Sequence, residues 1–62
     1  MENFWQAYDE FWSVPQTRNN RDKLRVIFDR AVREAHVSKI GPDAVHAIGP
    51  AIEMAYVLED LK

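Results

Sequence analysis

The first twelve residues carry apolar side chains with the period of an α-helix. The apolar positions recur at i, i+1, i+4, i+7 and i+8, so at about 100° per residue they fall on one arc. Pro15 ends this run, because proline disfavours helix at the preceding residue and lacks the amide hydrogen that the next turn needs. The pattern predicts a helix over residues 2–12. Its aromatic face is formed by Phe4, Trp5, Tyr8, Phe11 and Trp12.

A second helical pattern follows a polar connector and predicts a helix over residues 20–37. Asn19 or Asn20 is a suitable N-cap, because a short polar side chain can accept a hydrogen bond from the first free amides. Val26 and Val37 lie on the opposite side from the other apolar positions of this segment. The main apolar face is formed by Leu24, Ile27, Phe28, Ala31, Val32 and Ala35.

The third pattern predicts a helix over residues 42–61. Gly41 suits the end of the preceding helix and Pro42 suits the first position of the new one. Pro50 cannot donate to the carbonyl four residues earlier, which predicts a kink or a break near Gly49 and Pro50. The apolar arc of this helix is more than about 200° wide, wider than a helix on one core usually needs. Such a helix is covered from two sides, either by the two other helices or by a second copy of the chain.

Together these patterns predict an all-α fold, a single three-helix domain over residues 1–62. No stretch alternates with the period of a strand, and no hairpin turn is evident. The chain has 62 residues, 47% of them hydrophobic, and no cysteine. A domain of this size buries only about 60% of its unfolded surface, so one small core is marginal without a disulfide or a metal.

We therefore predict that the missing part of the core comes from another copy, which makes the protein a homodimer. The aromatic face either completes the core of the chain or anchors a partner. Small residues of the third helix would let a second helix approach closely. The residues predicted to form protein interfaces are Phe4, Trp5, Tyr8, Phe11, Trp12, Ala44, Ile48, Ala51, Ile52, Ala55 and Leu58.

Charge is distributed unevenly along the chain. Residues 18–34 carry six basic and three acidic side chains, a balance of +3, and the rest carries two basic and seven acidic ones, a balance of −5; the sum is the net charge of −2. The basic segment either contacts phosphates, or is neutralised by the acidic helices beside it, or binds an acidic protein. Nucleic-acid-binding domains usually have a basic excess, whereas this chain is acidic overall. Nucleic-acid binding is therefore only the alternative function. It would use Arg18, Arg21, Arg25, Arg30 and Arg33.

Residues able to perform catalysis are few. The serines Ser13 and Ser38 lie outside any nucleophile elbow, and His36 and His46 belong to different predicted helices. A His-Glu-x-x-His motif is absent, and each of the two glycines precedes a proline, so neither a zinc site nor a phosphate-binding loop is predicted. We therefore expect no enzymatic activity, no cofactor and no metal.

The chain shows no signal peptide and no apolar run of the roughly 20 residues that a membrane span needs. The sequence accordingly predicts a cytoplasmic protein that does not contact membranes. Its function is predicted to be that of a small, non-catalytic protein–protein interaction module, which regulates, adapts or inhibits a larger protein. The identity of that protein partner does not follow from the sequence.

Overall fold

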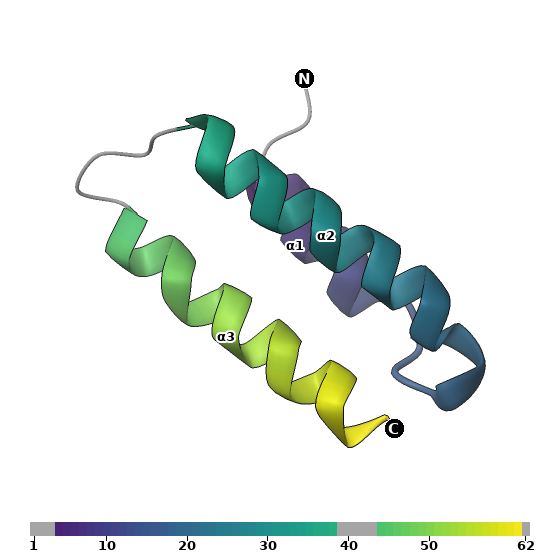
Figure 1. Cartoon of the computed structure of the whole chain (residues 1–62). Helices are drawn as coiled ribbons and strands as arrows, with labels where there is room; N and C mark the ends of the chain where they lie inside the picture. Colours follow the sequence, from purple (N-terminus) through teal and green to yellow (C-terminus); the bar gives the residue numbers. More distant parts are fainter. Residues whose placement is uncertain (1–3, 39–43, 62) are drawn as a thin grey trace.

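The computed structural model describes residues 4–38 and 44–61, which form three α-helices and one short 3-10 turn (Figure 1). Helix α1 is Phe4–Ser13, the turn η1 is Arg18–Asn20, α2 is Arg21–Ser38 and α3 is Ala44–Asp60. The described part of the chain contains no strand, so the predicted all-α three-helix fold is confirmed. The predicted helix starts at residues 2 and 42, and the break at Gly41 and Pro42, lie outside the described residues.

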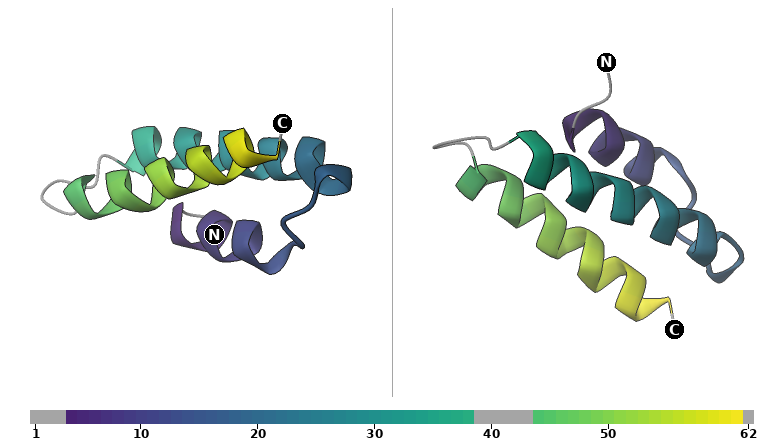
Figure 2. Two further views of the ribbon diagram at one scale, coloured as in Figure 1. Left: turned by 90° about the horizontal axis from the view of Figure 1, so that it is seen from below. Right: turned by 45° about the horizontal axis from the view of Figure 1, so that its top comes forward.

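The helices are arranged in two layers. Helices α2 and α3 lie side by side and run in opposite directions, and α1 packs against one face of this pair (Figures 1 and 2). Helix α2 makes most of the contacts to both neighbours, whereas α1 and α3 touch each other least. The molecule is therefore flat, with Cα extents of 35 × 22 × 15 Å. Among the described residues, no helix lies over the other face of the α2–α3 pair (Figure 2).

The core consists of small and large side chains at helical spacing. Ala7 lies between Phe4 and Phe11 on α1, at a position that the predicted aromatic face omits. Ala31 occupies a comparable buried place on α2, where a small side chain lets the neighbouring helix approach closely. The buried core side chains of the described residues are Phe4, Ala7, Phe11, Leu24, Ile27, Ala31, Met54 and Leu58.

Helix α3 continues through Pro50 as one helix. The chain therefore does not break into two helices at this point, although a break was one of the two predicted outcomes. The predicted kink stays a prediction. Pro50 is half-buried and Gly49 is exposed.

The connector between α1 and α2 is held by side-chain hydrogen bonds to the backbone. Nε2 of Gln16 donates to the carbonyl oxygens of Phe11, at 2.9 Å, and of Val14, at 2.8 Å. Nδ2 of Asn20 donates back to the carbonyl oxygen of Pro15 at 3.0 Å. Asn20 is the last residue of η1 and directly precedes α2, and the predicted asparagine cap of α2 stays a prediction.

Gln16→Ala is expected to lower the free energy of unfolding by about 1 kcal/mol, because the two carbonyl groups at the end of α1 lose their donor. The Oε1 atom of the same side chain is buried without a hydrogen-bond partner, which keeps the net loss small. Urea denaturation followed by circular dichroism measures the change. Thr17→Ala is the matched control, since Thr17 makes no side-chain capping bond, and it should stay within about 0.5 kcal/mol of the wild type. Equal losses for the two variants would contradict the role of Gln16.

Candidate functional site

The predicted aromatic face of α1 is divided between the core and the surface. Phe4 and Phe11 are buried and belong to the core of the chain. Trp5 is 44% exposed and Trp12 is 38% exposed, with the half-buried Tyr8 between them. The rings of Trp5 and Tyr8 are 5.7 Å apart and those of Tyr8 and Trp12 are 6.1 Å apart, both edge to face. The part of this face that a partner could reach is therefore the outer row of Trp5, Tyr8 and Trp12.

Helix α3 exposes a longitudinal row of large apolar side chains, which we name the α3 ridge: Ile48, Ile52 and Tyr56. Their exposed fractions are 56%, 48% and 66%. The residues are four apart, so each lies one turn beyond the previous one on the same side of the helix. Two of them, Ile48 and Ile52, are predicted interface residues. Tyr56 is not, although its spacing of four residues from Ile52 is the signal that would have identified it.

The other predicted interface residues of α3 lie closer to the core. Ala51 and Ala55 are half-buried and form a low row beside the ridge. Leu58 is buried and packs in the core of its own chain. Ala44 begins α3, and its side chain lies outside the described part of the structure.

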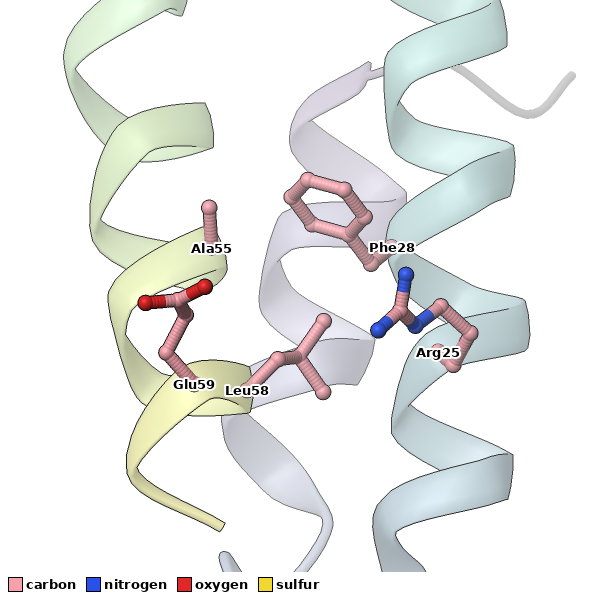
Figure 3. A pocket seen from close by; sticks show the side chains of 5 residues that line it. All are labelled: Arg25, Phe28, Ala55, Leu58 and Glu59. Carbon is pink, nitrogen blue, oxygen red and sulfur yellow. The ribbon is translucent and has the colours of Figure 1, made fainter. Parts of the chain in front are cut away.

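A small cavity of about 140 Å³ opens between α2 and α3 (Figure 3). Arg25 and Phe28 lie on the side of α2 away from Arg30, which pairs with Glu10 of α1, so the cavity is on the face of the α2–α3 pair away from α1. Drug-sized ligands need pockets of about 300–1,000 Å³. A space of this size instead matches one apolar group, because an engineered cavity of about 150 Å³ accepts a benzene molecule. The lining residues are Arg25, Phe28, Ala55, Leu58 and Glu59.

The cavity has an apolar wall with charged groups on both helices. Phe28, from α2, and Leu58, from α3, supply apolar surface, while Arg25 and Glu59 stand on opposite helices at its edge (Figure 3). Ala55 contributes only a methyl group, which leaves the space open. An apolar side chain that entered this cavity would be buried without requiring a hydrogen-bond partner.

The five arginines of the nucleic-acid alternative do not share one face. Arg30 pairs with Glu10 of α1, on the side of α2 that faces that helix. The other four are placed as follows: Arg18, Arg25 and Arg33 are exposed and Arg21 is half-buried.

Acidic residues interrupt the exposed basic side of α2. At about 100° per residue, Asp22 and Asp29 fall between Arg25 and Arg33 around the helix, and both are exposed. This interruption weakens the attraction for a phosphate backbone, because each carboxylate opposes a neighbouring guanidinium. Nucleic-acid binding stays a prediction that no feature of the described surface favours.

The acidic and histidine side chains do not form a metal-binding cluster in the described residues. His36 and His46 are both exposed, one on α2 and the other on α3. Within residues 4–38 and 44–61, no three histidine, aspartate or glutamate side chains are grouped to hold a metal ion.

None of the helices in the described ranges is long and apolar enough to cross a membrane.

The most distinctive surface of the described residues is the α3 ridge with the cavity beside it. Comparisons with protein families, with curated proteins and with solved structures found no match for this chain.

Proposed function

We propose that this protein is a small, non-catalytic helical interaction module that acts by binding, and that it forms a homodimer through the α3 ridge. The observation that carries the proposal is the ridge itself. Ile48, Ile52 and Tyr56 expose about half or more of their side chains on three successive turns of one helix. Single exposed apolar residues are common on soluble proteins, whereas a contiguous row marks an interaction surface.

The energetics of the ridge indicate how large the interface has to be. Full burial of a side chain of this kind contributes about 1.5–3 kcal/mol, so covering the exposed halves of two ridges would gain roughly 4–9 kcal/mol. Association costs about 4–15 kcal/mol in lost freedom of motion. The ridges alone would therefore give at best a weak dimer. A stable one must also cover neighbouring surface, for which the groove between α2 and α3 is available.

Ile52→Glu is expected to raise the dissociation constant of the dimer by at least about 100-fold, because a carboxylate would be buried without a partner in each half of the interface. Sedimentation equilibrium at high micromolar concentration measures the change, and circular dichroism confirms that the helices persist.

Val37→Glu is the matched control for this substitution. Val37 is an apolar residue that is 71% exposed, but it lies on α2 and outside the ridge. This variant should dimerise like the wild type. The proposed function fails if the folded wild type sediments as a single species of 7.2 kDa, or if only Val37→Glu disrupts the dimer.

A further inference from the structure

We propose that the two copies pair through antiparallel α3 helices, with Ile52 at the two-fold axis and Ile48 of each chain inserted into the α2–α3 cavity of the other. This inference rests on the proposed function, since it assigns the geometry of the same ridge. The partner that covers the α3 ridge is a second copy of this chain, because the shape and the charge of α3 are complementary to those of α3 itself.

The surface of α3 is complementary to itself in shape. The α3 ridge is a row of residues four apart, and the low row of Ala51 and Ala55 runs alongside it. Rows of this kind pack into the grooves between the corresponding rows of another helix. Because the α3 ridge and the low alanine row lie on the same helix, each copy can insert its ridge over the alanine row of the other. A two-fold symmetric interface requires this reciprocity.

The antiparallel orientation brings Ile48 to the cavity. With Ile52 on the axis, the residue at position 48 of one chain lies opposite position 56 of the other. At about 100° per residue, Ile48 lies on the side of the ridge nearest to Ala55, and the two-fold axis keeps it on that side in the partner. It therefore reaches the opening beside Ala55 and Glu59, where the cavity of about 140 Å³ can hold an aliphatic side chain.

The same orientation accounts for Gly49. A methyl group added at Gly49 would meet no atom within 4 Å, so packing inside the chain does not require glycine there. Glycine also disfavours helix relative to alanine, which makes its place inside α3 unexpected. Tyr56 lies on the side of the ridge nearest to Gly49, and in the antiparallel pair its ring lies over the partner's copy of that residue. The absence of a side chain at Gly49 leaves room for the ring.

Charge also favours the antiparallel orientation over the parallel one. The C-terminal end of α3 carries Glu59 and Asp60, both exposed, and its first turn carries no acidic residue. Antiparallel pairing places these carboxylates at the positive end of the partner helix, where negative charge is stabilised. Parallel pairing would instead bring both pairs of carboxylates together, and like charges in proximity oppose association.

The orientation is tested by cross-linking, which is specific here because the chain contains no cysteine. Ile52→Cys is expected to give a covalent dimer with a short bismaleimide. A mixture of Ile48→Cys and Tyr56→Cys chains should also cross-link, whereas Ile48→Cys alone should not, and Val37→Cys serves as a negative control. If Ile48→Cys alone cross-links, and the mixture gives no product that joins position 48 of one chain to position 56 of the other, the antiparallel geometry is overturned while the homodimer stands. If sedimentation finds only monomer, both the geometry and the proposed function are overturned.

A second variant tests the geometry without a cysteine in the ridge. Gly49→Leu would place a side chain where the ring of Tyr56 is expected, and it should raise the dissociation constant at least about tenfold, as overpacking by a side chain of this size does. His46→Leu is the control, because His46 is exposed on α3 at about 120° around the helix from Ile52, outside the ridge. It should change the dissociation constant by less than about twofold, in line with a surface substitution outside an interface. Wild-type affinity for Gly49→Leu would overturn the antiparallel geometry.

Discussion

Phe11→Ala is expected to lower the free energy of unfolding by about 3–5 kcal/mol, the range for the truncation of a large buried aromatic side chain. Phe11 is fully buried in the core, so its removal loses apolar burial and leaves a cavity. A domain of 62 residues has a total stability of roughly 3–9 kcal/mol. The variant should therefore keep at most about 6 kcal/mol and unfold, as followed by circular dichroism, at a much lower urea concentration than the wild type.

Asp9→Ala is the matched control, since Asp9 is exposed on the same helix. Its stability should stay within about 0.5 kcal/mol of the wild type. A Phe11→Ala variant that unfolds at the same urea concentration as Asp9→Ala would mean that α1 does not complete the core of the chain.

Met54→Ala is expected to lower the free energy of unfolding by about 2–5 kcal/mol, because it removes one of the two buried side chains through which the described part of α3 joins the core. The other is Leu58, one turn further along. Since α3 touches α1 only slightly, its packing rests mainly on α2, and its partly buried residues Ala51, Val57 and Leu61 replace little of the lost burial. Thermal unfolding followed by circular dichroism should show a midpoint many degrees lower than that of the wild type.

Glu53→Ala is the control for Met54→Ala, as an adjacent exposed residue on the same helix. All variants have to be compared at one protein concentration, because dimerisation stabilises the folded chain by mass action. Equal midpoints for the two variants would show that α3 is held mainly by something other than its buried side chains. If the protein dimerises as proposed, the thermal unfolding midpoint of the wild type should rise with protein concentration.

Much of the fold was predictable from local signals in the sequence. The helical period of the apolar residues located each helix, and the observed end of α1 and the observed bounds of α2 each differ from the predicted ones by one residue. Pro15 marked the end of α1 correctly, because the effect of proline on the chain is local. The 3-10 turn before α2, in which Asn20 bonds back to Pro15, was not predicted. That arrangement depends on the path of the connector in space.

The candidate site was predictable only in part. The apolar arc of the third helix was too wide for one small core, and the structure does leave Ile48, Ile52 and Tyr56 exposed. The sequence could not separate these residues from Leu58, which lies on the same broad arc and is buried. The cavity was also beyond prediction, because it is formed by residues of two helices whose relative position is a property of the packed chain.

The sequence by itself determined that the chain forms three helices, which part of the chain each occupies, and that the apolar arc of the third is wider than a helix on one core usually needs. Periodicity defines an apolar arc on a helix but not the rotation of the helix about its axis. Only the tertiary structure decided that rotation. Packing of α1 through Ala7 turned Phe4 and Phe11 inward and left Trp5 and Trp12 outside. Likewise, α3 docked through Met54 and Leu58, and the remaining part of its arc became the ridge that we propose binds a second copy.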